Sequence, residues 1–338
     1  MTLEDRITAL AALGSHVRNN QEHWASLQAA AFNENQWFTI DNTSKSLRAI
    51  ADQYLDERRL RSWVANYDIQ ADHRRRVGLV LAGNIPLVGW HDVLCTFVAG
   101  HTAVLKLSSK DRVLITGLID ALQSIDNQSI SYFEIHDQLK DFDAVIATGG
   151  ETAATHFEHY FGRYPNVIRG NRSSVAVLSG DESNEDLELI GQDVFTYFGM
   201  GCRSVSKLYV PRGYDFDRFF KAIIPFGSVI EHSKYKNNYD YSNAIYLLGQ
   251  TPFLTNNFLI LMESPDLSSR ISCLHYEYYD DQMELDKLLS EQIDEIQCIS
   301  TTLQLPSVHT VSFGECQRPG LRDYADGIDT MSFLTTQI

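Results

Sequence analysis

Cys202 is the side chain of this sequence best placed to act as a nucleophile. It follows two glycines in the segment Gly199-Met200-Gly201-Cys202-Arg203, at the end of an expected amphipathic helix. Glycine has no side chain, so a ligand can approach the backbone closely there. A lone cysteine is more often a small buried hydrophobic residue, and the glycines shift that expectation only modestly. The rest of the sequence has to decide between the two interpretations.

Three other segments end an apolar run with small or polar residues, as strand-to-helix turns do. They are Ala82-Gly83-Asn84-Ile85-Pro86-Leu87, Lys106-Leu107-Ser108-Ser109 and Thr148-Gly149-Gly150. Each can present backbone N–H groups to a phosphate at the start of a helix, although each signal is weak alone. The first segment lacks the G-x-G-x-x-G pattern of a Rossmann dinucleotide site, which argues against an ordinary Rossmann dehydrogenase.

The elements that carry these turns alternate between short apolar runs and amphipathic segments from Val77 onward. This alternation is typical of βαβ units. The first seventy or so residues have helical periodicity instead. The expected strands and helices of this part are 77–82, 87–99, 102–107, 113–122, 144–147 and 151–161.

A second α/β block begins near Ser173. Its expected strands are 175–178, 206–210, 244–248 and 258–262, and its expected helices are 186–198 and 215–224. The polar, tyrosine-rich segment Lys234–Asn243 is predicted to be an exposed loop or an interface. The tail after Val311 is predicted to be rich in loops and to finish in a short amphipathic or extended piece.

Composition excludes several classes of protein. A chain of 338 residues that is 44% hydrophobic can form about two domains, and a net charge of −16 disfavours nucleic acid as a partner. Five scattered cysteines without a C-x-x-C pair predict neither disulfides nor a zinc site, which favours a reducing, cytoplasmic setting. Neither an export signal nor a membrane span is expected. An anionic ligand would need local cations and helix N-termini.

Four short motifs, taken in order, resemble the aldehyde dehydrogenase superfamily and more closely its fatty acyl-CoA reductase branch, the LuxC-like reductases of bacterial luminescence. Asn84-Ile85-Pro86-Leu87 resembles the family's Asn-Phe-Pro-Leu turn, and Val104-Leu105-Lys106 resembles its Val-Leu-Lys strand end. Thr148-Gly149-Gly150 resembles its Thr-Gly-Ser helix start, and Gly201-Cys202 matches its catalytic cysteine. The resemblance covers most of the chain from about Val77 onward.

The resemblance implies an aldehyde-dehydrogenase-like fold with two doubly wound α/β domains and N-terminal helices. An NADP-binding domain is expected over 1–172 plus 313–338, and a catalytic domain over 173–312, with the chemistry in the cleft between them. The family also implies a homo-oligomer, and it is compatible with a partner protein that transfers acyl groups.

Residue roles follow from the resemblance. Cys202 is the implied nucleophile, and Asn84 is implied to stabilise the oxyanion together with the Cys202 backbone N–H. No metal is implied. Without the family, Asn84 could simply be a turn residue before Pro86. The implied cofactor-binding residues, which by default would be a surface lysine and tight turns, are Lys106, Ser108, Ser109, Lys110, Thr148, Gly149 and Gly150. No role is assigned to Glu263, His91, His156 or His275.

Two departures from the family pattern are informative. Ile168-Arg169-Gly170-Asn171 stands where aldehyde-oxidising members carry a Glu-Leu-Gly-Gly turn whose glutamate activates water. An acyl-CoA reductase must protect its acyl-enzyme from water, so this loss favours reduction over oxidation. Ser109, followed by Lys110, stands where NAD-preferring members usually place a glutamate, which favours the 2′-phosphate of NADPH.

These inferences predict NADPH-dependent reduction of a long-chain acyl-CoA thioester to the aldehyde through a Cys202 acyl-enzyme. The first alternative is an aldehyde or semialdehyde dehydrogenase that acts on a small substrate. An alternative of another class is an acyl-transfer or acyl-binding subunit that uses Cys202 without redox chemistry.

Overall fold

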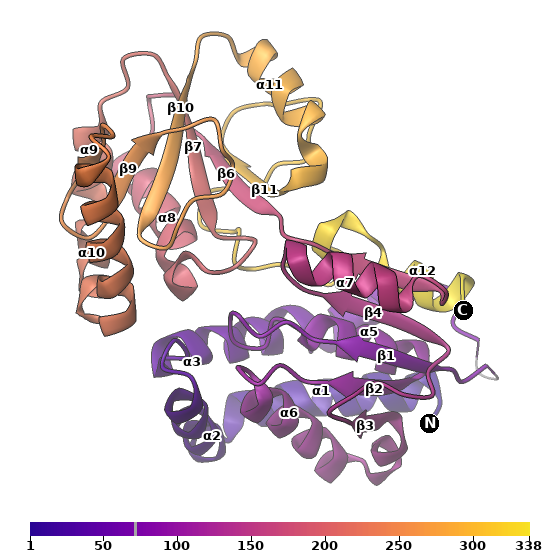
Figure 1. Ribbon diagram of the computed structural model, residues 1–338. Coiled ribbons are helices and arrows are strands. Elements are labelled where there is room, and N and C mark those ends of the chain that lie inside the picture. Colours follow the sequence, from indigo (N-terminus) through magenta and orange to yellow (C-terminus); the bar gives the residue numbers. More distant parts are fainter. Residues whose placement is uncertain (71–72) are drawn as a thin grey trace. The chain divides into compact units, whose positions relative to one another are not determined.

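The computed structural model describes residues 1–70 and 73–338, which form two compact units (Figure 1). Unit 1 comprises residues 1–171 and 319–338, and unit 2 comprises residues 172–318. The return to unit 1 therefore begins at Pro319 rather than at residue 313. Each unit is built on a largely parallel sheet, which confirms the predicted α/β class. The assignment of cofactor binding to one unit and catalysis to the other stays a prediction.

The N-terminal region is helical, as its periodicity predicts. Side chains cap three of its helices: Thr2 in a capping box on α1, Thr39 on α3 and Asp56 on α4. The apolar side chains of Ile7 and Leu10 on the first helix are buried. The elements of this region are α1 (Leu3–Asn19), α2 (Gln21–Glu34), α3 (Ile40–Ala49), the π-helical turn η1 (Ile50–Tyr54) and α4 (Glu57–Val64).

The sheet of unit 1 has five parallel strands in the order β3-β2-β1-β4-β5. Its interior strands are nearly continuous apolar runs, as is usual when helices cover both faces of a sheet. Its elements are β1 (Arg76–Val80), α5 (Trp90–Ala99), β2 (Thr102–Lys106), α6 (Arg112–Ile125), the 3-10 helix η2 (Asn127–Tyr132), β3 (Phe133–Ile135), β4 (Ala144–Thr148), α7 (Glu151–Phe161) and β5 (Asn166–Arg169).

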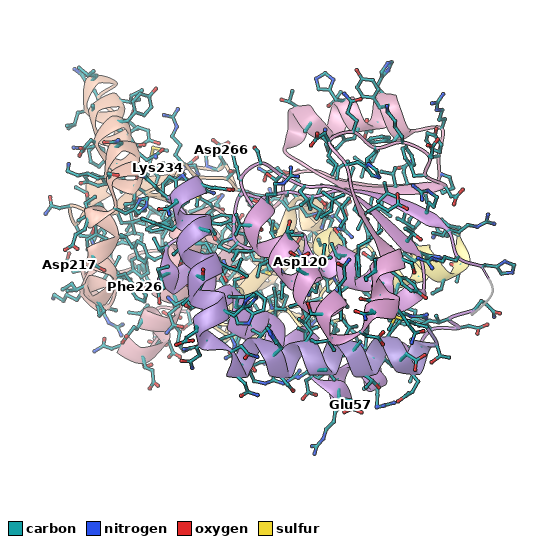
Figure 2. The ribbon with its side chains drawn as sticks, turned by 90° about the horizontal axis from the view of Figure 1, so that it is seen from below. Glu57, Asp120, Asp217, Phe226, Lys234 and Asp266 are labelled. Atoms are coloured by element: carbon teal, nitrogen blue, oxygen red, sulfur yellow. The ribbon has the colours of Figure 1, made fainter. Side chains whose placement is uncertain are left out.

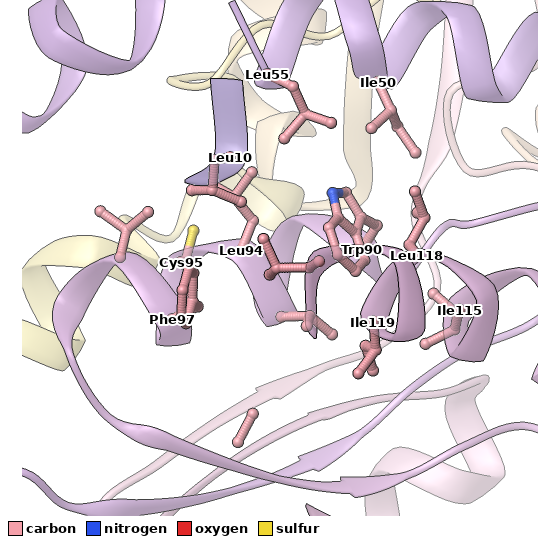
Figure 3. Close-up of a cluster of buried hydrophobic side chains, with 14 of the residues drawn as sticks. Leu10, Ile50, Leu55, Trp90, Leu94, Cys95, Phe97, Ile115, Leu118 and Ile119 are labelled. Atoms are coloured by element: carbon pink, nitrogen blue, oxygen red, sulfur yellow. The ribbon is translucent and has the colours of Figure 1, made fainter. Parts of the chain in front are cut away.

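One large core joins the sheet of unit 1 to its helices. Figure 3 shows Trp90 among side chains of α1, α5, α6 and η1, such as Leu10, Ile50 and Leu118. Burying side chains of this size contributes about 1.5–3 kcal/mol each. The other face of the sheet packs against Phe157 and Phe161 of α7. The returning segment contains the 3-10 helix η6 (Ala325–Gly327) and α12 (Thr330–Thr336), and α12 adds Met331, Phe333 and Leu334 to the large core.

The sheet of unit 2 has the order β11-β6-β7-β10-β9-β8, and only the short edge strand β8 is antiparallel. Helices α8 and α9 pack on one face and α11 on the other. Its elements are β6 (Ser173–Val177), α8 (Asn184–Phe195), η3 (Thr196–Gly199), β7 (Val205–Pro211), α9 (Phe216–Ala222), η4 (Ile224–Glu231), α10 (Ser233–Leu248), β8 (Leu254–Thr255), β9 (Ile260–Glu263), β10 (Cys273–Tyr279), α11 (Gln282–Glu291), η5 (Ile293–Glu295) and β11 (Ile296–Thr301).

The segment 234–248 differs from its prediction. An exposed loop or an interface over Lys234–Asn243 and a strand over 244–248 were expected, but α10 runs without interruption from Ser233 to Leu248. Tyr235, Tyr239 and Ser242 recur at helical spacing and are buried. The tyrosines therefore supply the packed face of a helix, and the apolar end of the segment continues that helix.

Acidic side chains on the outside of helices account for part of the negative charge. Figure 2 shows Glu57, Asp120 and Asp217, which are exposed on α4, α6 and α9. Within the described residues, no helix combines the length and apolar character that crossing a membrane requires.

Candidate functional site

The candidate residues of unit 1 meet at one edge of its sheet. The Asn84 turn follows β1, Lys106 ends β2, and Thr148 ends β4. Because these strands are parallel, their carboxyl ends share an edge. The strand order also reverses between β1 and β4, which is the crevice where open α/β sheets generally bind ligands.

The Asn84 turn is exposed at its tip and buried at its base. Asn84 is exposed, whereas Gly83 is buried against the turn after β2. A Cβ on Gly83 would lie 2.5 Å from Ser108 Oγ, so no larger residue fits without movement. Ser46 Oγ donates a 2.8 Å hydrogen bond to the carbonyl of Pro86. The turn thus has a fixed backbone and an accessible amide side chain.

The segment 106–110 presents two exposed cations. Lys106 and Lys110 are exposed, as is Ser109, while Ser108 is half-buried. Ser108 Oγ accepts the Lys110 backbone N–H at 3.3 Å, and Asn35 Nδ2 donates to the Lys110 carbonyl at 3.3 Å. These contacts hold a short cationic turn of the kind that can meet a phosphate or a ribose.

The Thr148 turn contains a buried hydroxyl oxygen whose hydrogen-bonding capacity is not used within the described residues. Thr148 Oγ1 is buried and has no hydrogen-bond partner among the described residues. Gly149 is packed closely, because a Cβ there would lie 2.8 Å from that of Ala153, whereas Gly150 has open space around it. Gly150 is the N-cap of α7, and the first amides of a helix lack intrahelical acceptors. The turn could therefore accept a polar, anionic ligand.

Cys202 lies in unit 2, in the turn before β7. The Ser204 backbone N–H donates to the Gly201 carbonyl at 2.9 Å, which closes a turn with Cys202 and Arg203 at its centre. Ser174 Oγ donates to the Cys202 carbonyl at 2.8 Å. The Cys202 side chain is neither fully buried nor fully exposed. Its backbone is therefore held by hydrogen bonds while the residue stays partly exposed.

The approach to this turn is strained. Tyr197, Phe198 and Gly199 adopt φ values of 56°, 59° and 74° in succession. Side chains disfavour this left-handed region, and such strain is often concentrated at functional sites. The Phe198 ring packs 4.6 Å from the His232 ring, which helps to hold the conformation. The predicted helix 186–198 accordingly ends as α8 at Phe195 and continues only as η3.

The buried carboxyl group of Asp193 supports the Cys202 turn through a chain of hydrogen bonds. Asp193 of α8 accepts the backbone N–H of Gly314 at 2.8 Å and that of Cys316 at 3.1 Å. Gln317 Nε2 then donates to Ser204 Oγ at 3.0 Å. Burial raises the pKa of Asp193 to about 6, although the Gly314 and Cys316 hydrogen bonds oppose this. These contacts also explain why residues 313–318 belong to unit 2.

Sequence reasoning missed a second thiol beside the Cys202 turn. Arg203 Nη1 lies 3.1 Å from Cys298 Sγ. Hydrogen bonding with the Cys316 thiol lowers the pKa of Cys298; burial opposes the shift and Arg203 supports it. Both thiols are buried, so neither can meet a substrate in this conformation. Only a spatial contact reveals them, because Cys298 and Cys316 are distant from Cys202 in sequence.

The stretch 168–171 carries no general base. Arg169 is buried and donates through Nη1 to both carboxylate oxygens of Asp92 at 2.8 Å, and through Nη2 to Thr330 Oγ1 at 2.6 Å. Its side chain therefore ties β5 to α5 and α12. Ile168, at the predicted glutamate position, has no titratable group. This arrangement is structural.

The structure brings Asn84, the 106–110 turn and the 148–150 turn to one edge of unit 1, and it places Cys202 in unit 2. His91 packs between aromatic rings and contacts the Leu321 carbonyl, and the ring of His275 contacts the Asp266 carbonyl. His156 lies on α7, and Glu263 is the exposed last residue of β9. Across the described residues, no cluster of three His, Cys, Asp or Glu side chains could hold a metal ion.

Comparison with known proteins supplies a family match. The model of the family described as acyl-CoA reductase (LuxC) matches residues 26–223. The long-chain acyl-protein thioester reductase 2 of Photobacterium leiognathi is 23% identical over 196 residues, which cover 52% of this chain and 41% of that protein. The long-chain acyl-protein thioester reductase of Aliivibrio fischeri is 22% identical over 147 residues, which cover 38% of this chain and 30% of that protein. The matched region thus spans less than half of either relative.

Solved structures share the fold over most of the chain. An NADP dependent enzyme from E. coli aligns with a TM-score of 0.67 at 13% identity, over 91% of this chain and 75% of that one. Aldehyde dehydrogenase 21 from Physcomitrella patens, in complex with succinate, gives 0.66 at 15% identity over the same shares. A mutant aldehyde dehydrogenase C from Pseudomonas syringae, complexed with NAD+ and octanal, aligns with a TM-score of 0.63 at 14% identity. The alignment covers 90% of this chain and 73% of that one.

Proposed function

Because the chain belongs to the acyl-CoA reductase (LuxC) family, we propose that it reduces an acyl-CoA thioester to an aldehyde with NADPH, through an acyl group carried on Cys202. The observation that carries the proposal is the family match itself. It covers residues 26–223 and so includes both the Asn84 turn and the Cys202 turn. The aldehyde dehydrogenase fold, which these solved structures share over 91% of the chain, supports the same reaction class.

Cys202 would begin the reaction by attacking the thioester carbonyl as a thiolate. A new bond forms between its sulfur and the acyl carbon, and the bond to the CoA sulfur breaks, so CoA leaves as the thiolate. Ser174 and the Gly201–Ser204 turn hold the backbone during this exchange. The oxyanion that develops would be stabilised by the Cys202 backbone N–H and the Asn84 amide.

The edge of unit 1 fits a phosphorylated dinucleotide. The start of α7 suits a pyrophosphate, as does the Thr148 hydroxyl, which has no hydrogen-bond partner in the described part of the chain. Lys106, Ser109 and Lys110 suit the adenosine ribose. A cation without a nearby glutamate in this turn supports a 2′-phosphate and hence NADPH. When bound, NADPH supplies the hydride that reduces the acyl carbonyl. Asn84 would again hold the oxyanion, and Cys202 would leave as the thiolate when the aldehyde forms.

Residues 168–171 support reduction rather than oxidation. The acyl-enzyme would survive only if no group activated water against it. Ile168 cannot do so, and Arg169 is already paired with Asp92. The lack of a base at this position would therefore favour the aldehyde product over hydrolysis to the acid.

A second candidate donor is an acyl group carried by a protein. The relatives in P. leiognathi and A. fischeri are named long-chain acyl-protein thioester reductases. Such a donor has the same thioester carbonyl, so the steps at Cys202 would not change. The two donors differ only in what surrounds the leaving thiol.

One assay tests the proposal. NADPH oxidation and aldehyde formation are measured with acyl-CoAs from acetyl to palmitoyl, and with the same acyl groups on an acyl carrier protein. Cys202→Ser is compared with Cys95→Ser, a buried thiol on α5 of unit 1. We expect aldehyde from one donor class, with loss of at least about three orders of magnitude in Cys202→Ser alone.

Other outcomes separate the alternatives. Acyl label on Cys202 without NADPH oxidation would favour a transfer protein and contradict the reductase. Turnover of small free aldehydes to acids would favour an aldehyde dehydrogenase. Equal activity in both cysteine variants would remove Cys202 from the mechanism.

A further inference from the structure

Asp111 is a buried acid that is turned away from its own helix. It occupies the N-cap of α6, where aspartate usually accepts a backbone N–H of the first helical turn. Here it makes no side-chain capping bond. Its exposed fraction is 3%, so the carboxyl group has left the solvent without serving the helix. Another role must account for its place in the fold.

The carboxyl group instead contacts the Asn84 turn. Asp111 Oδ2 accepts the backbone N–H of Leu87 at 2.5 Å. Leu87 has a φ of 60°, in the left-handed region that a residue with a Cβ rarely adopts. The hydrogen bond therefore compensates for a disfavoured backbone conformation three residues after Asn84.

Two other contacts seat the same turn. Gly83 packs directly against Ser108, and a Cβ on Gly83 would lie 3.2 Å from that of Asp111. Ser46 Oγ holds the Pro86 carbonyl from α3. Gly83 joins the Asn84 turn to the turn that follows β2 by packing, and Asp111 joins them by a hydrogen bond to the Leu87 backbone. A change at Asp111 should therefore be transmitted to Asn84.

The surroundings of the second carboxyl oxygen bear on the protonation of Asp111. Asp111 Oδ1 is buried and has no hydrogen-bond partner among the described residues. Burial raises the pKa of Asp111 well above its usual range, and the Leu87 hydrogen bond opposes this only in part. A neutral acid can still accept the Leu87 N–H through one oxygen. Asparagine has the same size and neutrality, so it is the natural conservative replacement.

We infer that Asp111 is a positioning residue of the proposed reduction, and that it places the Asn84 amide by holding the backbone of Leu87. The inference rests on the proposed role of Asn84 in stabilising the oxyanion. Asp111 itself would touch neither substrate nor cofactor. Its loss should therefore lower kcat while the KM for acyl-CoA and the Kd for NADPH change little.

A double-mutant cycle tests the inference in the full chain. Asp111→Ala, Asp111→Asn, Asn84→Ala and the Asp111→Ala/Asn84→Ala pair are compared by kcat, KM and NADPH binding. Asp56→Ala is the control, because it also removes a bond from a backbone N–H to a carboxylate in the same unit, here an exposed one from Arg59. We expect Asp111→Ala to lower kcat about tenfold to a hundredfold. Asp111→Asn and Asp56→Ala should stay within about fivefold of wild type.

Non-additivity is the decisive result. In the Asn84→Ala background, Asp111→Ala should cost no more than about twofold, because the group it positions is gone. Losses that multiply, or Asp111→Asn as slow as Asp111→Ala, would overturn the inference while leaving the proposed function intact. Full activity of Asn84→Ala would overturn both the inference and the oxyanion role of Asn84, while the reduction through Cys202 would stand.

A second anchor keeps the test open if Asp111→Ala does not fold. Ser46→Ala removes only the hydrogen bond to Pro86 on the same turn. Its effect on kcat should also vanish in the Asn84→Ala background. A Ser46→Ala loss that persists there would show that the turn does not act through Asn84, and the inference would fail.

Discussion

The two units present their candidate residues at opposite ends of their strands. In unit 1 the Asn84, 106–110 and 148–150 turns follow β1, β2 and β4, at the carboxyl edge where parallel sheets generally bind ligands. In unit 2 Cys202 precedes β7 and is held by Ser174 at the start of β6. The first arrangement follows from topology, whereas the second depends on particular hydrogen bonds. The candidate residues of the two units should therefore respond differently to mutation.

The largest effect in unit 1 is expected at Asn84. Asn84→Ala removes a donor to the oxyanion, and loss of one such donor typically lowers the rate by about two to three orders of magnitude. Stopped assays of aldehyde formation would measure this, and Cys202 should still take acyl label at a reduced rate. Asn84→Asp is a size-matched control that removes the donor but keeps the shape. Wild-type turnover in either variant would refute the role.

The support of the Cys202 turn should depend on pH through Asp193. Its pKa is raised from 3.8 to about 6 in the fold, so the folded state binds the proton more tightly. This contribution is complete below the unfolded pKa of 3.8 and is lost as pH rises through about 6. A shift of this size corresponds to about 3 kcal/mol. Urea unfolding followed by circular dichroism should show the decline in wild type.

Asp193→Asn should remove that slope. Tryptophan fluorescence provides a control within the molecule, because Trp24, Trp37, Trp63 and Trp90 all lie in unit 1. The pH dependence of the unfolding transition followed by tryptophan fluorescence should be the same in Asp193→Asn and in wild type. An unchanged slope in circular dichroism would contradict a folded pKa near 6.

Cofactor preference should depend on the turn after β2. Ser109→Glu places a carboxylate beside Lys110, where it would repel a 2′-phosphate and accept a ribose hydroxyl. We expect the ratio of kcat/KM for NADPH to that for NADH to fall about tenfold, or about 1.4 kcal/mol. Ser109→Gln is the uncharged control. An unchanged ratio would place the adenosine ribose elsewhere.

The smallest effect is expected at Ser174. Ser174→Ala removes one hydrogen bond to the Cys202 carbonyl, worth about 1 kcal/mol, so acylation should slow about fivefold. Ser269→Ala is a useful comparison, because its hydroxyl donates to the Cys273 carbonyl, away from the Cys202 turn. Equal slowing in the two variants would show that the effect is not specific to the turn.

The sequence predicted the first region better than the second. Short apolar runs followed by small residues indicate β1, β2 and β4, and the turns after such strands share an edge by topology alone. Cys202 could be singled out from its glycines and the family resemblance. The left-handed backbone at Tyr197 and Phe198 could not, because ordinary aromatic residues occupy it.

Contacts between distant residues account for most of what was missed. Asp111 accepts a hydrogen bond from Leu87, and Asp193 accepts hydrogen bonds from Gly314 and Cys316. No local sequence pattern predicts these pairings. Helix α10 was mistaken for a loop and a strand because its buried face is made of tyrosines. Strand β10 carries Glu277 and three tyrosines, so it lacks the apolar run that identifies its neighbours.

The insertion of unit 2 into unit 1 has a consequence for synthesis on the ribosome. Residues 172–318 must be made before Tyr324 can accept the hydrogen bond from Trp63 Nε1, and before Thr330 can meet Arg169. At translation rates of about 5–20 residues per second, this delay is of the order of ten seconds. During that interval unit 1 has an uncovered apolar surface where α12 will pack. Nascent chains arrested before residue 319 should therefore bind chaperones more strongly than chains whose α12 has emerged from the ribosome.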